Sequence, residues 1–449
     1  MGAFLALIIA LGTLAFGAVY PWGYLPLFAI AACIGVAGLV RQRGVPAGAR
    51  AISAGLLLVA LAIGAQLVPV SRTTLAFLSP HAADILGRHS LKFTADGTTH
   101  PLSLNPASTG LALLELTTLG LYFIGLSGLL SRRDLRSLTK YLILFAVPLA
   151  LVGIFAREHN NGLVYGFWQP LRGSNSNGFG PFVNRNHFAG WMVMTASLAI
   201  GVLCAWVELA LDKVKPGLRN RIVWLSTPEA SGLILIAASV VVMAISLVWT
   251  MSRSGIVSFT CALGCFVGLV ALRRDVVGAR RVTVVAALAA LLLISVNWRG
   301  IDPLMQWFAD TTDLVSRVAA WHDGWQVVKD FPIAGVGLNA YPDAMLFYQK
   351  NVLETWMTHA HNDYLQLLAE GGLLVITAAV IAVVLLAIAI RRSVNAARDD
   401  SYGYWVRTGA AVGLVAIAIQ ETVEFSLHMP ANALLFATLA AIAISPRHN

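Results

Sequence analysis

Charged side chains are scarce in this chain of 449 residues: Asp, Glu, Lys and Arg make up 12% of it, against about 25% in a soluble domain. Hydrophobic residues make up 58% and gather in runs of about 17–25, the length that crosses ~30 Å of hydrocarbon as a helix. The alternating strand pattern of a membrane β-barrel is lacking. The sequence therefore predicts an all-α polytopic membrane protein.

Cysteine is also rare, and no disulfide framework is implied. The four cysteines all lie within apolar runs, at Cys33, Cys204, Cys261 and Cys265. Cys261 and Cys265 share a helix face, as a metal-binding pair would. A packing role is favoured for them, because a free thiol behaves as a small hydrophobic side chain.

Two short signals of nucleotide or metal-diphosphate chemistry are missing. No Asp-x-Asp triplet occurs in the chain, and no Gly-Lys-Ser/Thr follows the Gly/Asn/Ser tract at 173–180, which indicates a flexible loop. The net charge of +9 does not indicate nucleic-acid binding, because most Lys and Arg residues lie in short loops between apolar runs. No nucleic-acid partner is expected.

Twelve membrane spans are expected, with both termini in the cytoplasm. About two thirds of the 31 Lys and Arg residues lie in one set of loops, and basic loops stay cytoplasmic. The first run lacks the basic start of a signal peptide and is expected to remain as a helix. The expected spans cover residues 3–20, 24–40, 51–70, 108–130, 139–156, 187–211, 231–250, 255–272, 282–297, 372–390, 408–424 and 430–445.

The long loops all fall on the outer face, near 71–107, 156–186 and 298–371. Loops of this length in a compact protein are usually functional. The chain is thus expected to comprise helices 1–9 over 1–297, a large and partly helical loop over 298–371, and helices 10–12 over 372–449.

The stretch from His359 to Gly372 lies where the large loop re-enters the membrane. Asp363 and Gln366 have capping-box spacing, which places His361 just ahead of a helix N-terminus. The positive end of the helix dipole disfavours an imidazolium and therefore favours a neutral general base. Two alternatives stay open: metal binding together with His359, although no set of Cys or carboxylate ligands accompanies the pair, and a purely structural histidine.

Arginines on the outer face run against the basic-inside bias. Arg253 lies in a short turn between two spans and is flanked by Ser252 and Ser254, whereas Arg185 lies with His187 at the mouth of another span. A guanidinium binds phosphate oxygens in bidentate fashion. The alternative is an anchor at the headgroup level.

A third arginine, Arg317, opens an amphipathic segment that runs to residues 331–337. Glu421 and Glu424 lie near the outer end of a span, where acids are costly and usually functional. They are expected to balance the arginines.

These residues resemble the O-antigen ligase and Wzy-type polymerase superfamily of bacterial membrane glycosyltransferases. Its members carry a large periplasmic loop that ends in the pattern H-[NSQ]-x9-G-x-x-[GTY]. His361, Asn362 and Gly372 match this pattern, and Val375 departs from its last position. Three further stretches resemble the group, and the resemblance covers residues 170–390: Phe-Val-Asn-Arg-Asn-His-Phe-Ala at 182–189, Ser-Arg-Ser-Gly at 252–255, and Arg317 to Gly-Val-Gly at 335–337.

The resemblance implies a metal-independent, inverting transfer of the GT-C type at the periplasmic face of the inner membrane, with no cofactor. The donor would be a glycan on undecaprenyl diphosphate. The acceptor would be a hydroxyl of the lipid A-core in a ligase, of a lipid-linked repeat unit in an O-antigen or exopolysaccharide polymerase, or of Ser or Thr in a protein O-oligosaccharyltransferase. The expected roles are His361 as base, Arg253, Arg317 and Arg185 on the diphosphate, and Asn362, Asp363, His187, Ser252, Ser254, Glu421 and Glu424 in support.

Within this class the loop pattern favours a ligase over a polymerase. A transporter or flippase is the main alternative from another class. It is disfavoured because transporters often have paired halves, whereas the polar groups here gather on one side, in one long loop. A structural scaffold gives no reason for His361, Arg253 and Arg317 to share one face.

Overall fold

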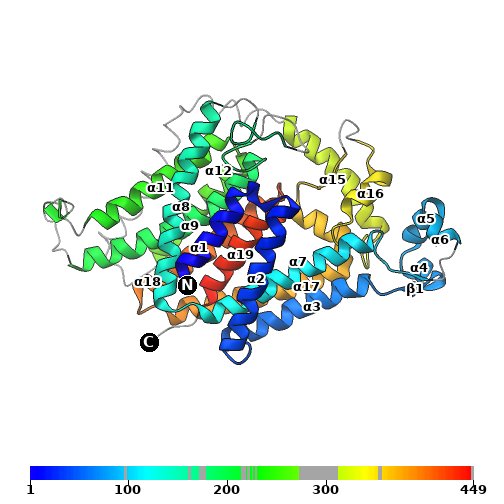
Figure 1. Cartoon of the computed structure of the whole chain (residues 1–449), viewed down its shortest axis with the longest axis horizontal. Coiled ribbons are helices and arrows are strands. Elements are labelled where there is room, and N and C mark those ends of the chain that lie inside the picture. The colour runs from blue at the N-terminus through cyan, green and yellow to red at the C-terminus, as the bar shows by residue number, and fades with distance from the viewer. Residues whose placement is uncertain are drawn as a thin grey trace.

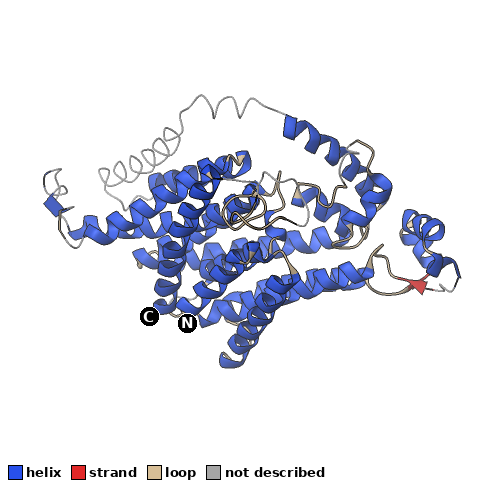
Figure 2. Cartoon of the chain, turned by 45° about the horizontal axis from the view of Figure 1, so that its top comes forward, coloured by secondary structure: helices blue, strands red, loops and turns tan. Residues whose placement is uncertain are grey.

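The computed structural model describes residues 1–95, 99–159, 163–170, 178–213, 219, 223–224, 226–227, 230–272, 312–351 and 356–445. This part of the chain is almost entirely helical (Figures 1 and 2). Its strands β1 (Val70–Ser71) and β2 (Thr99–His100) form an antiparallel pair, in which Val70 lies opposite His100.

Among the described residues, nine helices are long and apolar enough to cross a membrane, and two shorter apolar helices, α1 (Gly2–Leu14) and α19 (Pro430–Ile444), pack beside them. The all-α polytopic membrane fold is therefore confirmed. The nine are α2 (Pro21–Arg41), α3 (Arg50–Gln66, preceded by η2, Ala47–Ala49), α7 (Pro106–Leu129), α8 (Arg132–Glu158), α9 (Arg185–Lys213), α11 (Ser231–Thr250), α12 (Arg253–Leu272), α17 (Asp363–Ala396) and α18 (Ser401–Gln420).

Every expected span except that over 282–297, which lies outside the described residues, corresponds to one of these helices. The expected helix over 3–20 is shorter, because α1 ends at Leu14 and a 3₁₀ turn, η1 (Phe16–Ala18), follows with Gly17 at φ +71°. The expected helix over 372–390 is longer. It begins at Asp363, and it is contacted by α15 and α16 of the large loop.

The remaining helices lie at one end of the bundle. α15 (Thr312–Asp330) and α16 (Tyr341–Tyr348) come from the large loop and contact α17. α4 (Arg72–Leu78), α5 (Pro80–His89) and α6 (Leu91–Ala95) form a small lobe that projects from the bundle (Figures 1 and 2).

α9 and α18 are the most buried of the spanning helices. Glycines allow their backbones to approach closely, as small residues do in membrane helix pairs. A Cβ on Gly201 would lie 2.4 Å from the Trp405 carbonyl oxygen, and one on Gly409 would lie 2.9 Å from that of Ser197. The middle parts of α9 and α18 are thereby fixed against each other.

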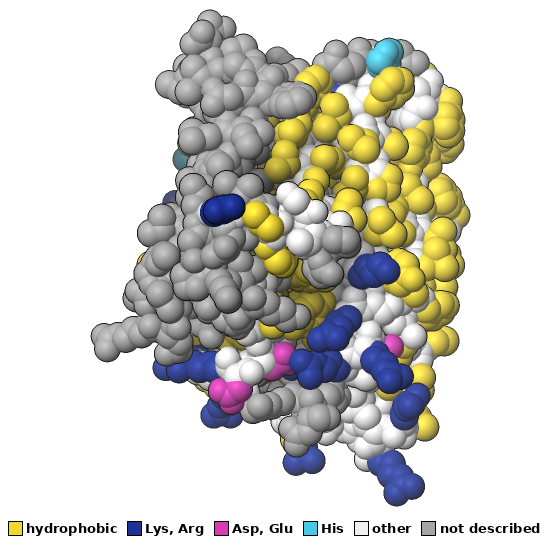
Figure 3. All heavy atoms as spheres, turned by 90° about the vertical axis from the view of Figure 1, so that its left-hand side faces the viewer, with side chains coloured by type: hydrophobic (Ala, Val, Ile, Leu, Met, Phe, Trp, Pro, Cys, Tyr) yellow, Lys and Arg dark blue, Asp and Glu magenta, His cyan; other side chains and the backbone are white. Residues whose placement is uncertain are grey.

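The two ends of the bundle differ in side-chain chemistry. Lys and Arg gather in the lower half of Figure 3, beyond an apolar band, and both termini lie low in Figure 1. The prediction that this end faces the cytoplasm rests on that distribution of charge.

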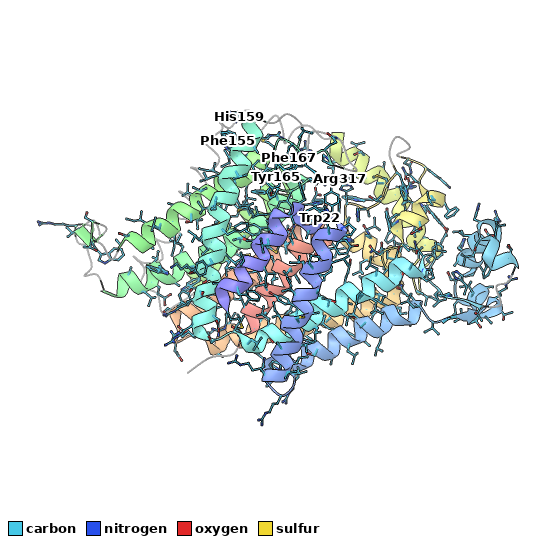
Figure 4. The ribbon with its side chains drawn as sticks, in the orientation of Figure 1. Trp22, Phe155, His159, Tyr165, Phe167 and Arg317 are labelled. Atoms are coloured by element: carbon cyan, nitrogen blue, oxygen red, sulfur yellow. The ribbon has the colours of Figure 1, made fainter. Side chains whose placement is uncertain are left out.

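Aromatic side chains mark the opposite end. Trp22, Phe155 and Phe167 are 56%, 65% and 72% exposed there, and Figure 4 shows them at the same end of the molecule as Arg317. Aromatic belts of this kind lie at the level of the lipid headgroups.

Candidate active site

His361 lies directly before α17, in the left-handed backbone region at φ +51°. Asn362 is the N-cap: it is extended, and its Oδ1 accepts a hydrogen bond from the backbone N–H three residues on, at 3.0 Å. The expected cap, Asp363, is therefore wrong by one residue. The Gln366 side chain accepts instead from the Ala360 N–H, at 3.0 Å. His361 nevertheless lies just ahead of the helix N-terminus, as predicted.

α17 kinks at Gly372, where φ is +55° and ψ is −164°. Residues 332–337 of the large loop pack against this kink through several backbone hydrogen bonds. A Cβ on Gly372 would lie 2.5 Å from the Ile333 carbonyl oxygen, so the glycine is required both for its backbone angles and for this approach. The backbone bonds are Leu373 N–H to Pro332 O (2.9 Å), Leu374 N–H to Ile333 O (3.0 Å), Val336 N–H to Ala369 O (3.0 Å) and Gly337 N–H to Glu370 O (3.0 Å).

Gly372→Ala is expected to lower the stability of the protein by about 1–3 kcal/mol through backbone strain alone, with the clash at Ile333 adding to it. Thermal unfolding of the protein in detergent, followed by tryptophan fluorescence, measures the effect. Gly264→Ala is the matched control, because a Cβ at Gly264 meets no atom within 4 Å. An unchanged midpoint for Gly372→Ala would contradict the docked arrangement.

A buried carboxylate also fixes the large loop. Glu370 is 2% exposed, and it accepts the backbone N–H groups of Asn339 at 2.9 Å and Tyr341 at 3.1 Å. Gln66, at the end of α3, donates to the carbonyl oxygens of Ala334 (2.6 Å) and Glu370 (2.8 Å). The loop is thus bound to two spanning helices. Neither role was predicted from the sequence, although Gln66 is a polar residue within an apolar run.

Arg317 reaches from α15 to the turn that follows α18. Its Nη2 lies 2.7 Å from Glu424 Oε1, and its Nη1 donates to the Val423 carbonyl oxygen. Glu424 is 1% exposed. Asn186, one residue after Arg185 at the start of α9, donates to the same Oε1 at 2.5 Å. Glu424, one of the two acids expected to balance the arginines, therefore forms an ion pair with Arg317.

The second oxygen of Glu424 faces the histidine. His361 Nδ1 lies 3.9 Å from Glu424 Oε2, and neither atom has a hydrogen-bond partner among the described residues. Burial opposes the charged form, but His361 and Arg317 outweigh it and hold the pKa of Glu424 below its usual range. Glu424 is thus a carboxylate that lies between an imidazole and a guanidinium.

The Phe425 ring is surrounded by imidazoles. His359 stacks on it, with ring centroids 4.1 Å apart, and His361 and His187 each meet it edge-on at 4.8 Å. His428, in η4 (Ser426–His428), lies 6.3 Å away. Neither Phe425 nor His428 was predicted from the sequence, although both follow closely after the acidic pair.

Glu421 connects the same turn to α17. Its carbonyl oxygen accepts the Asp363 N–H at 3.0 Å, and its Oε2 accepts the Ser426 N–H at 2.7 Å. Burial and the nearby Asp363 carboxylate raise the pKa of Glu421 well above its usual value. Glu421 therefore serves to shape the turn.

The turn that carries Arg253 lies against α9. Ser252 Oγ accepts the Gly255 N–H at 3.2 Å, so Ser252 caps the start of α12, and it lies 3.2 Å from Ser254 Oγ. A Cβ on Gly255 would lie 2.6 Å from the Ala189 Cβ. Arg253 is thereby held beside the first turns of α9, the helix that also carries Arg185 and His187.

An open groove of about 560 Å³ lies between α15 and α17. The polar tips of two lining residues are already bonded: Trp321 Nε1 donates to the Ala360 carbonyl oxygen (2.8 Å) and the Tyr364 hydroxyl to that of Ala418 (2.6 Å). The groove therefore presents mainly apolar surface, and it begins next to His361. Its lining residues are Val318, Trp321, His322, Trp325, Asn362, Tyr364, Leu365 and Leu368.

A family model described as O-antigen ligase matches residues 238–380 of the chain. The match includes Arg253, Arg317 and His361, whereas Arg185 and Glu424 lie outside it. No curated protein matches the sequence. Residues 238–380 thus match the O-antigen ligase family, and the resemblance of this polytopic membrane protein to the O-antigen ligase and Wzy-type superfamily is confirmed.

Proposed function

We propose that this protein transfers a glycan from undecaprenyl diphosphate to a hydroxyl acceptor at the periplasmic face of the bacterial inner membrane. The observation that carries the proposal is the meeting of His361 and Arg317 on one buried carboxylate, Glu424. This cluster combines a candidate base with a candidate phosphate ligand. It also belongs to the end of the molecule that carries the aromatic belt, as Arg317 shows in Figure 4.

The carboxylate of Glu424 favours the His361 tautomer with its proton on Nδ1, and this leaves Nε2 as the proton acceptor. The acceptor hydroxyl gives its proton to Nε2 while its oxygen forms a bond to the anomeric carbon of the donor sugar. The bond from that carbon to the phosphate oxygen breaks at the same time. Attack from the face opposite the leaving group inverts the anomeric centre, and the carrier diphosphate leaves as an anion.

The leaving diphosphate gathers negative charge, which prealigned donors stabilise in a site of low dielectric. A guanidinium has five N–H donors. The bonds of Arg317 to Glu424 and Val423 therefore leave donors available for phosphate oxygens. Arg253 and Arg185, at the starts of α12 and α9, are the other proposed ligands. This chemistry uses side chains of the chain alone.

The surroundings of the cluster suit a lipid-linked substrate. The groove beside His361 is mainly apolar and lies along the first turns of α17, which continues as a membrane span. A lipid-linked donor with its diphosphate at Arg317 would meet the apolar surface of this groove. We therefore assign the lipid-linked glycan, and not a soluble sugar nucleotide, as the donor.

The acceptor distinguishes two versions of this function. A ligase acting on the lipid A-core is the first candidate, because His361, Asn362 and Gly372 match the ligase loop pattern. A polymerase is the second, because Val375 departs from that pattern.

Glycan analysis of a strain that lacks the gene tests both versions. Lipid-linked chains of normal length, with none joined to the lipid A-core, are the expected result for a ligase. Single unextended repeat units would identify a polymerase. Unchanged glycans, together with flux of the lipid-linked substrate in liposomes that contain the purified protein, would overturn the proposal in favour of a transporter.

A further inference from the structure

We infer that His428 and Asp363 form a positioning pair that holds the proposed base, His361, in register with Glu424. The inference rests on the proposed function in treating His361 as the base. It concerns two residues that the loop pattern does not specify, and neither needs to touch a substrate.

The backbone of His361 needs outside support. Its φ of +51° is uncommon for a residue with a side chain, and such a conformation persists where the surrounding structure imposes it. On one side, Ala360 is held through its N–H by Gln366 and through its carbonyl oxygen by Trp321. The other side depends on Asp363, whose N–H donates to the Glu421 carbonyl oxygen.

The Asp363 side chain makes the second connection on that side. Its Oδ1 lies 3.2 Å from His428 Nε2. Asp363 is the first residue of α17, and His428 belongs to the turn that also carries Glu424 and Phe425. The pair therefore joins the element that bears the base to the element that bears its carboxylate partner. Without the pair, the turn can move relative to α17 and change the 3.9 Å separation between His361 Nδ1 and Glu424 Oε2.

The charges around His428 keep its imidazole protonated at neutral pH. The acids that act on its ring are Asp363, Glu370 and Glu115, and the neighbouring imidazoles are those of His359 and His187. Burial opposes the cation, but the Asp363 carboxylate outweighs it and raises the pKa of His428 to about 9.

The neighbouring histidine His359, in contrast, is expected to stay neutral. Burial and the nearby histidines lower its pKa well below the usual value.

The sign of the pH dependence follows from the raised pKa. The contribution of the pair is complete below the ordinary histidine pKa of about 6.5 and is lost as the pH rises through about 9. Wild-type turnover is therefore expected to fall on the alkaline side, near pH 9. A variant that lacks the His428 imidazole is expected to show no fall in turnover near pH 9.

The test uses the full-length protein in nanodiscs, supplied with a polyprenyl-diphosphate-linked glycan and a hydroxyl acceptor. His428→Gln and Asp363→Asn are each expected to lower kcat by about 10–100-fold through misplacement of the base, with the KM for the donor within about twofold. The double variant is expected to lose no more than either single variant, since the two residues act as one unit. The alkaline step should disappear in His428→Gln.

The matched control is His81→Gln. His81 also pairs with an aspartate, Asp330, with Nε2 and Oδ1 3.6 Å apart, but it lies on the projecting lobe. It is expected to keep wild-type kcat and the wild-type pH profile.

Two results would overturn the inference and leave the proposed function intact. One is wild-type kcat in His428→Gln while His361→Ala is inactive. The other is a wild-type profile that stays flat from pH 8 to 10, and this measurement needs no variant to fold. Activity in His361→Ala would instead refute the proposed function itself.

Discussion

His361→Ala is expected to abolish glycan transfer while the protein remains folded and inserted in the membrane. Loss of a general base costs about 10²–10⁴ in rate, so kcat should fall by that factor with little change in the KM for the donor. Folding should survive, because the Asn362 side chain caps α17 and His361 Nδ1 makes no hydrogen bond among the described residues.

Transfer assays in nanodiscs measure the loss, and circular dichroism reports the helix content. His159→Ala is the control: His159 lies at the same end of the molecule (Figure 4) and stacks on Phe155, with ring centroids 4.3 Å apart. The His159→Ala variant should keep the wild-type kcat. Full activity in His361→Ala would remove the histidine from the mechanism.

Arg317→Ala is expected to lower kcat/KM by about 10²–10³-fold, the cost of removing one preorganised donor to a developing anion. The substitution also leaves Glu424, which is 1% exposed, without its cationic partner. Arg317→Lys should recover only part of the loss, because an ammonium does not reproduce the planar fork that contacts Glu424 and the Val423 carbonyl oxygen together.

The measurement is donor kinetics at fixed ionic strength. Arg88→Lys is the control, because Arg88 pairs with Asp84 at 2.8 Å on the exposed surface of the projecting lobe. Equal rates for Arg317→Lys and the wild type would contradict the two-point contact. Equal rates for Arg317→Ala would contradict any role of Arg317 with the diphosphate.

The membrane-spanning architecture was predictable because each apolar run needs no partner to become a helix in lipid. Composition and run length were sufficient for α7, α11 and α12. The ends were less predictable where tertiary contacts decide them. α17 begins at Asp363, before the apolar run, because its first turns are bound by the large loop and by the turn after α18.

The candidate site residues could be selected one by one from the sequence, but the contacts between them could not be predicted. His361, Arg317 and Glu424 were each selected from chemistry and from the predicted outer face. Their meeting depends on contacts between distant segments, with 107 positions separating Arg317 from Glu424, and no local pattern encodes such contacts.

His428 and Phe425 were missed for the same reason. A usable signal was present, because polar residues recur through the last, otherwise apolar, hairpin. They include Gln420, Glu421, Glu424, His428 and Asn432.

The docked kink at Gly372 gives the nine residues between Asn362 and Gly372 a geometric meaning. The glycine is anchored by the loop at one end of this helical segment, and the imidazole is presented at the other. An inserted residue would advance the histidine by about 1.5 Å and swing it about 100° around the helix axis, away from the carboxylate that faces it. The number of residues between Asn362 and Gly372 therefore sets where the imidazole lies relative to Glu424.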